Sequence, residues 1–121
     1  RLVRLICAKC KIPLKSQNEI LQEIKKDIDI ESQDVQLYAG KGCEECRFTG
    51  YRGRTGIYEV LTVTEPIREL VLARASSQQI KQKAVSGGMR TLRQDGLQKV
   101  IMGLTTFNEV VRVTQQEALP E

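Results

Sequence analysis

Four cysteines are the residues whose type and spacing most directly suggest chemistry. They are the only cysteines among the 121 residues, and they form two Cys-x-x-Cys pairs. A gap of two residues lets both sulfurs of a pair face one point at the tip of a tight turn, and two such turns supply four roughly tetrahedral ligands. A closed shell of four thiolates suits zinc best. We therefore expect one structural zinc ion bound by Cys7, Cys10, Cys43 and Cys46.

Three other uses of these cysteines stay open at this stage. Iron in a rubredoxin-like site would use the same ligands, but charged residues such as Lys9, Glu44 and Arg47 surround the cysteines instead of the usual apolar ones. A thioredoxin-like redox pair needs a single Cys-x-x-Cys at the start of a helix. Two disulfides would fit a secreted chain, yet we find no signal peptide and no long apolar run. We favour reduced, zinc-bound thiols in a cytoplasmic protein.

The expected metal site is structural, because four protein ligands leave no open position for water or substrate. The chain also has no histidine, which removes the commonest general base near neutral pH. Backbone amides after each cysteine pair, at Lys11 and Arg47, are expected to donate hydrogen bonds to the sulfurs. The glycines at 50, 53 and 56 precede β-prone residues and lack the Gly-Lys-Ser/Thr of a phosphate-binding loop, so they predict tight turns.

The elements that position the cysteines predict an α+β fold, in which a small β-strand region carries an inserted tetracysteine zinc-binding module and is followed by a bundle of short helices. Residues 1–6 and 54–64 are expected to form two paired strands, so that residues 7–53 are an insertion at their ends. Residues 65–114 have helical patterns and are expected to form a C-terminal helical subdomain. Residues 115–121 are expected to be a disordered tail.

Local signals refine this layout. Two capping boxes, Ser16 with Glu19 and Thr106 with Glu109, predict the starts of two helices. Gly96 falls inside a helical pattern, where glycine costs on the order of 1 kcal/mol relative to alanine. We therefore expect another element to approach that helix closely at Gly96.

The charge pattern bears on the choice of partner. The formal net charge is +4 and the pI is near 9, which raises the possibility of a zinc-ribbon module that binds nucleic acid. Such a module needs aromatic residues for base stacking and a one-sided basic face. Only Phe48 and Tyr51 lie near the second cysteine pair, and acidic residues are interleaved throughout. We expect no nucleic acid partner and no direct membrane insertion, and we keep the zinc ribbon as the alternative function.

Several longer stretches of the chain carry a family resemblance. They are RLVRLIC at 1–7, GYRGRTGIYEVL at 50–61, PIREL at 66–70, GMRTLRQDGLQKV at 88–100, GLTT at 103–106 and EVVRVT at 109–114. Together with the two cysteine pairs they resemble the tetracysteine and C-terminal helical region of bacterial type II secretion and type IV pilus assembly ATPases. The resemblance is weakest between residues 13 and 38, and Ala8 stands where that family often has proline.

The resemblance implies a fragment of a cytoplasmic hexameric motor, and a first residue that is not methionine agrees with a fragment. Such a motor is a homohexamer that hydrolyses ATP with magnesium and acts on a platform protein at the inner face of the inner membrane. The family's phosphate-binding loop, acidic residues and histidine motif all precede the region present here. The chain alone is therefore expected to have no catalytic or ATP-binding residues and no ATPase activity.

The resemblance also implies residue roles. Cys7, Cys10, Cys43 and Cys46 correspond to the zinc ligands of the family. The arginines at positions 1, 4 and 54 either lie near a nucleotide or subunit interface of the intact motor or are solvated residues at a sheet edge. Glu44, Glu45 and Arg47, at the expected tip of the second cysteine turn, are candidates for contacts with a partner.

Overall fold

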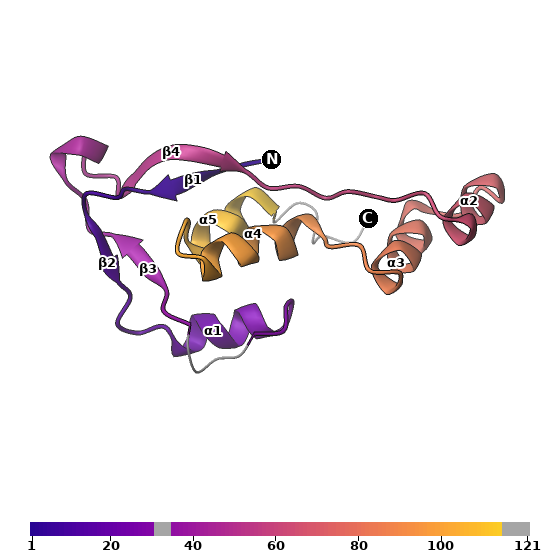
Figure 1. Ribbon diagram of the computed structural model, residues 1–121, viewed down its shortest axis with the longest axis horizontal. Coiled ribbons are helices and arrows are strands. Elements are labelled where there is room, and N and C mark those ends of the chain that lie inside the picture. The colour runs from indigo at the N-terminus through magenta and orange to yellow at the C-terminus, as the bar shows by residue number, and fades with distance from the viewer. Residues whose placement is uncertain (31–34, 115–121) are drawn as a thin grey trace.

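A computed structural model describes residues 1–30 and 35–114 and shows short strands and short helices around a small core (Figure 1). This confirms the α+β class. The tail expected at 115–121 lies outside the described residues. In chain order the elements are β1 (Leu2–Ile6), β2 (Lys11–Pro13), α1 (Asn18–Lys25), β3 (Tyr38–Gly40), the 3-10 turn η1 (Glu44–Cys46), β4 (Tyr51–Gly56), α2 (Glu65–Leu72), α3 (Ser77–Ser86), α4 (Leu92–Ile101) and α5 (Phe107–Thr114).

Two small antiparallel pairs of strands frame the cysteines. β1 pairs with β4, with Leu2 opposite Gly56 and Ile6 opposite Tyr51. β2 pairs with β3 in a second, shorter ladder. Because β1 ends one residue before the first cysteine and β4 starts shortly after the last one, the β1–β4 register places both cysteine pairs at the same end of the ladder.

The strand expected at 54–64 has the wrong bounds, since β4 spans Tyr51–Gly56. The ladder ends where β1 begins: the Ile57 N–H still donates to the Arg1 carbonyl at 2.8 Å. The β-prone residues beyond it continue as an extended segment, and Val60 is 72% exposed. β-propensity describes how well a side chain fits a pleated, half-buried surface, so these residues need a neighbouring strand to form a ladder.

The core lies between β1, α1 and the last two helices (Figure 1). Val3, Leu97 and Val110 are fully buried in it. The expected close approach at Gly96 is confirmed, because a Cβ there would lie 2.7 Å from a methyl carbon of Val110. The missing side chain thus lets α4 and α5 pack tightly. Helices α2 and α3 pack against each other, and no described helix is both long and apolar enough to cross a membrane.

Helix α1 starts differently from the prediction. Its N-cap is Gln17, not Ser16, and the expected capping box with Glu19 is not formed. The Gln17 side chain instead donates to the Val35 carbonyl at 2.9 Å and accepts from the Leu37 N–H at 2.8 Å. The helix thus starts without a local side-chain cap. The Gln17 side chain binds the backbone of Val35 and Leu37 and so fixes the start of α1 beside the segment that leads into β3.

Candidate metal centre

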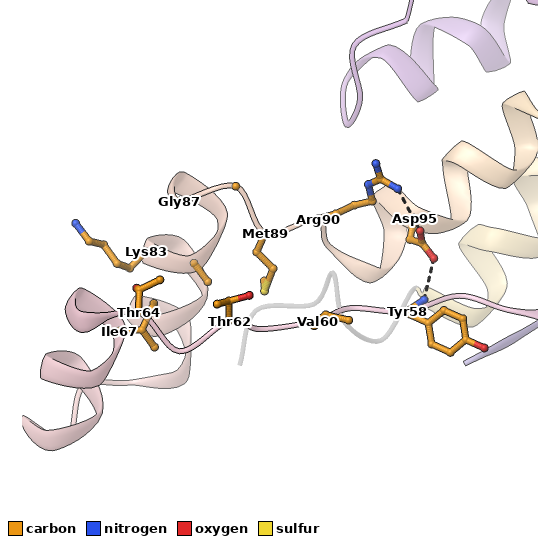
Figure 2. Close-up of a pocket in the computed structure, with 12 residues that line it drawn as sticks. Tyr58, Val60, Thr62, Thr64, Ile67, Lys83, Gly87, Met89, Arg90 and Asp95 are labelled. Carbon is orange, nitrogen blue, oxygen red and sulfur yellow. Dashed lines mark hydrogen bonds and ion pairs between the residues drawn. The ribbon is translucent and has the colours of Figure 1, made fainter.

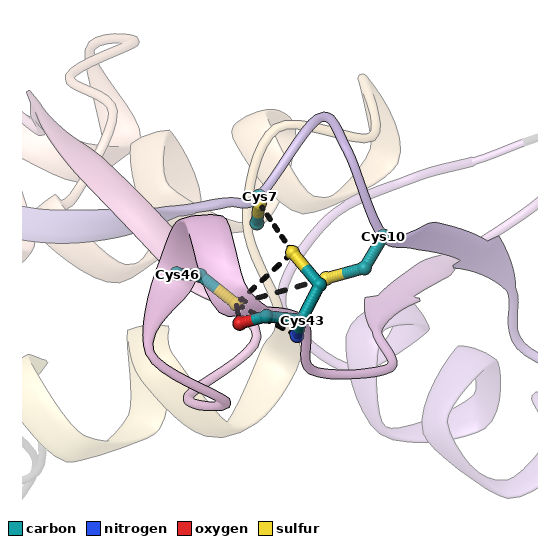
Figure 3. A group of neighbouring side chains, drawn as sticks. All are labelled: Cys7, Cys10, Cys43 and Cys46. Carbon is teal, nitrogen blue, oxygen red and sulfur yellow. Dashed lines mark hydrogen bonds between the residues drawn. The ribbon is translucent and has the colours of Figure 1, made fainter.

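The four cysteines come from two turns that meet at the end of the β1–β4 ladder (Figure 3). Cys7 directly follows β1, and Cys10 directly precedes β2. Cys43 starts the 3-10 turn η1, and Cys46 ends it. Cys7 and Cys46 are buried, whereas Cys43 is partly exposed. The structure therefore brings together all four residues that the sequence predicted as ligands.

The spacing of the four sulfurs matches tetrahedral coordination of a single metal ion. All four Sγ atoms lie within 4.8 Å of one another. The Cys7–Cys43, Cys10–Cys46 and Cys43–Cys46 sulfur pairs are each 3.8 Å apart. Four sulfurs held at about 2.3 Å from one zinc ion in a tetrahedron are about 3.8 Å from each other. A disulfide would need about 2.05 Å. The cysteines are thus free thiols arranged so that they could hold one metal ion.

Backbone N–H groups surround the sulfurs and complete the environment that thiolates need. Cys10 Sγ accepts from the Gly42 N–H at 3.3 Å. Cys46 Sγ accepts from the Cys43 N–H at 3.3 Å and from the Gly50 N–H at 3.2 Å. These donors stabilise negative charge on sulfur, which is the form that binds a metal.

The prediction that the backbone N–H groups of Lys11 and Arg47 donate to the sulfurs is wrong. The Arg47 N–H donates to the Glu44 carbonyl at 3.1 Å and closes the 3-10 turn. Lys11 lies opposite Gly40 in the β2–β3 ladder. The sulfur donors are Gly42, just before the second cysteine pair, Cys43, the first residue of that pair, and Gly50, four residues after it.

The environments of two thiols differ. Desolvation raises the pKa of Cys10 to about 11. Desolvation acts in the same direction on Cys46, but the N–H groups of Cys43 and Gly50 and the neighbouring thiols outweigh it and lower the Cys46 pKa to about 6. The backbone N–H groups thus favour the thiolate form of Cys46, which is the form that binds a metal.

The second cysteine turn depends on an unusual backbone path. Arg47 and Phe48 both adopt left-handed conformations, with φ of 55° and 62°, and Gly50 follows with φ of 83°. A Cβ at Gly40 would lie only 2.0 Å from the Gly50 carbonyl oxygen. The β2–β3 strand pair therefore touches the backbone that donates to Cys46. Gly50 forms a tight turn as the sequence predicted, whereas the turns predicted at Gly53 and Gly56 are wrong, because both residues lie within β4.

The proposed contact residues lie on the 3-10 turn and just after it. Glu44, Glu45 and Arg47 are exposed. The Glu45 carboxylate forms an ion pair with Arg52 of β4. Glu45 therefore also braces the turn against the strand, in addition to any role in binding a partner.

A buried carboxylate next to the site is a feature that the sequence analysis missed. Glu109 of α5 is 2% exposed. It accepts from the Arg4 backbone N–H and Nε, both at 2.8 Å, and from Arg112 Nε at 2.9 Å. Burial disfavours the charged form of Glu109, yet the hydrogen bonds from Arg112 and Arg4 lower its pKa to about 2. The sequence signal that could have revealed it is the i,i+3 spacing of Glu109 and Arg112.

The three arginines singled out in the sequence differ in their contacts, and only Arg4 binds Glu109. Arg4 is bound to Glu109, and its guanidinium also lies over the Tyr51 ring, 4.3 Å from the ring centre. The N-terminal ammonium of Arg1 donates to the Ile57 carbonyl at 3.0 Å. Arg54 is exposed on β4 opposite Arg4. The expected capping box of α5 is only half formed, because the Glu109 N–H donates to Thr106 Oγ1 while its carboxylate turns to the arginines.

A separate cavity of about 390 Å³ lies between the extended segment after β4 and the helices α2 to α4 (Figure 2). Asp95 closes one end of it. Its carboxylate accepts from the Tyr58 N–H at 2.9 Å and from Arg90 Nη1 at 3.4 Å. These contacts hold the segment onto α4, so Asp95 has a structural use.

Comparison with known proteins identifies the class to which this architecture belongs. A family profile described as "Type II/IV secretion system protein" matches residues 1–112. The chain therefore belongs to the type II/IV secretion system protein family, as the resemblance implied.

Curated relatives support the same assignment. A "Type IV pilus assembly ATPase PilB" of Thermus thermophilus is 44% identical over 94% of this chain, which corresponds to 13% of the relative. A "Type II secretion system protein E" of Dickeya dadantii is 41% identical over 97% of the chain and 22% of the relative. A "Type II secretion system ATPase E" of Vibrio cholerae is 40% identical over 96% of the chain and 22% of the relative. The chain thus spans less than a quarter of the length of these relatives.

Proposed function

We propose that this chain is a noncatalytic part of a hexameric secretion or pilus assembly ATPase and that its four cysteines hold one structural zinc ion. The observation that carries the proposal is the sulfur cluster, in which three S–S distances of 3.8 Å match a tetrathiolate shell. The donor set fits zinc, because all four ligands are soft sulfurs and no position is left for a substrate. The ion would supply folding energy and no chemistry.

The metal would stabilise a module that has little core of its own. The described residues between 7 and 50 form two three-residue strands, one short helix and a 3-10 turn. The buried apolar residues among them, Leu21, Ile24 and Leu37, pack into the core shared with α4 and α5, so the cysteine turns have little apolar support without a crosslink. Four metal–sulfur bonds would join the start of the module to its end, next to the β1–β4 ladder. A rigid module of this kind suits a contact surface for neighbouring subunits or for an inner-membrane platform protein.

The exposed turn that carries Glu44, Glu45 and Arg47 is the part of the module that we propose for such contacts. Reversing the charge at Glu44 tests this without disturbing the Glu45–Arg52 ion pair. We expect Glu44→Lys in the full-length motor to weaken binding to the platform protein, with Glu23→Lys at an exposed position of α1 as the control for charge alone. Unchanged binding for Glu44→Lys would rule out this turn as a contact site.

We assign ATP hydrolysis to the parent protein. Relatives named as ATPases extend far beyond the matched region, and this sequence has no Gly-x-x-x-x-Gly-Lys-Ser/Thr motif. ATP and magnesium would bind in the parent protein, which would work in the cytoplasm at the inner membrane through its partners. Purified residues 1–121 should hydrolyse no ATP above a buffer blank, and measurable turnover by this chain would refute the noncatalytic assignment.

Relatives that serve secretion and relatives that serve pilus assembly match the chain about equally well, so the proposal covers both machines. The family assignment favours the secretion or pilus motor over the alternative of a zinc ribbon that binds nucleic acid. Salt-dependent binding to generic DNA would support the alternative instead.

The proposed zinc ion is tested by mass spectrometry of protein purified without added metal. We expect one zinc per chain, and a metal-free protein with four titratable thiols would overturn the proposal.

A further inference from the structure

We infer that metal binding and the docking of helix α5 are energetically coupled through Tyr51 and the turn between α4 and α5. The inference rests on the structural metal proposed above. It adds that the module and the C-terminal helices form one cooperative unit, in which each stabilises the other. Three sets of contacts among the described residues carry it.

The first contacts join β1 to the α4–α5 turn just before the first ligand. The Ile6 N–H donates to the Leu104 carbonyl at 2.9 Å. Thr105 is fully buried, and its hydroxyl donates to the Arg4 carbonyl at 2.7 Å. Because Cys7 directly follows Ile6, the position of the first metal ligand depends on this turn.

The second contacts start from a ligand at the other end of the module. Gly50 donates its N–H to Cys46 Sγ at 3.2 Å, and its carbonyl accepts from the Cys7 N–H at 2.9 Å. Gly50 thus touches one ligand from each cysteine turn. The next residue, Tyr51, places its hydroxyl 2.7 Å from Thr106 Oγ1. Thr106 in turn caps α5 by accepting from the Glu109 N–H.

The third contacts close a ring between these two routes. Arg4 lies over the Tyr51 ring and binds the buried carboxylate of Glu109. Tyr51 is therefore held on its hydroxyl by α5 and on its face by β1. A displacement of Gly50 and Tyr51 would break contacts to Thr106 and Arg4 at the same time, so the network is expected to behave cooperatively.

Metal binding changes what holds Gly50 in place. A bound ion fixes the Cys46 thiolate and with it the acceptor of the Gly50 N–H, whereas a metal-free turn can move. Any free energy that the ion contributes to the position of Tyr51 is shared with α5. By linkage, the factor by which a docked α5 raises zinc affinity equals the factor by which bound zinc raises the docking equilibrium of α5.

The test measures zinc affinity by competition with a chromophoric chelator, using the full chain. Tyr51→Phe and Thr106→Val each remove one hydroxyl and keep the shape of the side chain. We expect Tyr51→Phe to weaken zinc binding by about threefold to tenfold, which is the range that one hydrogen bond typically contributes. Thr106→Val should weaken it at least as much, because it also removes the acceptor that caps α5. Two controls should stay within about twofold of the wild type: Thr106→Ser, which keeps the hydroxyl, and Tyr38→Phe, which leaves the ring under Lys11.

The reciprocal readout is amide hydrogen exchange with and without zinc. Removal of zinc should raise exchange in α5 by a similar factor and should leave α2 and α3 unchanged, because these two helices pack mainly on each other. The coupling would be overturned if the Tyr51→Phe and Thr106→Val variants fold and bind zinc with wild-type affinity. It would also be overturned if amide exchange in α5 is the same with and without zinc. A wild-type chain that binds no zinc would instead overturn the proposed function itself.

Discussion

Replacing Glu109 by glutamine should remove the largest single electrostatic contribution that we can assign in this fold. Glu109 is 2% exposed and accepts five hydrogen bonds, three from Arg4 and two from Arg112. Its pKa falls from an ordinary 4.5 to about 2. At 1.36 kcal/mol per pKa unit, that shift corresponds to an upper bound of about 3 kcal/mol.

The arginine partners reduce the expected effect. The side chains of Arg4 and Arg112 are 45% and 58% exposed, so water can solvate them when the carboxylate is gone. Glutamine also keeps one acceptor oxygen in the same place. We therefore expect Glu109→Gln to lower the free energy of unfolding by about 2 kcal/mol, measured by urea denaturation at pH 7 with zinc present.

The pH dependence gives the sharper test of this reasoning. Because the folded-state pKa is lowered, the stabilisation is fully present above about pH 4.5 and is lost as the pH falls toward 2. The difference between wild type and Glu109→Gln should therefore be constant from pH 7 to 5 and shrink below that.

A matched control is Glu23→Gln on α1. Glu23 pairs with Lys26 at 3.0 Å, but both side chains are more than half exposed. The expected loss is below about 0.5 kcal/mol. Equal losses for the two variants, or a Glu109 difference that does not shrink between pH 4.5 and 3, would refute the account of the buried pair.

Packing and ligation give three more expected outcomes. Gly40→Ala should lower the free energy of unfolding by more than about 2 kcal/mol and weaken zinc binding, because its Cβ would lie 2.0 Å from the Gly50 carbonyl oxygen. The control is Gly87→Ala, whose nearest contacts are 3.5 Å away. Equal shifts of the melting temperature in the two variants would contradict this reasoning. Gly96→Ala should lower the free energy of unfolding in urea by about 1 kcal/mol, since the clash with Val110 outweighs the better helix propensity of alanine. A variant more stable than the wild type would show that α5 can move away from α4 without cost. Replacing any one cysteine by serine should reduce zinc below one per chain in native mass spectra, and a full complement in all four variants would exclude the site.

The cysteine cluster was predictable because its signal is local. Each Cys-x-x-Cys pair defines a turn with two sulfurs on one side, whatever surrounds it. Gly96 was predictable for a similar reason, since a glycine inside a helical pattern needs a packing reason. In both cases the residue type and its position in the local pattern are enough to indicate the structural role.

The features that the sequence analysis missed depend on partners far along the chain. Residues 58–64 have strand propensity, but β4 ends at Gly56 and the segment after it joins no strand of the described chain. Ser16 has the chemistry of a cap, but Gln17 reaches the backbone near Leu37 and starts the helix instead. Glu109 looked like a local capping residue, yet Arg4, more than a hundred positions away, takes its carboxylate. Local patterns do not specify such pairings.

X-ray absorption at the zinc edge tests the central claim most directly, using protein purified without added metal. The sulfur spacing of 3.8 Å predicts one zinc per chain surrounded by four sulfurs at about 2.3 Å. A spectrum with nitrogen or oxygen ligands in place of two or more sulfurs, or a sample without zinc, would contradict the account of the tetracysteine site as the structural centre of this chain.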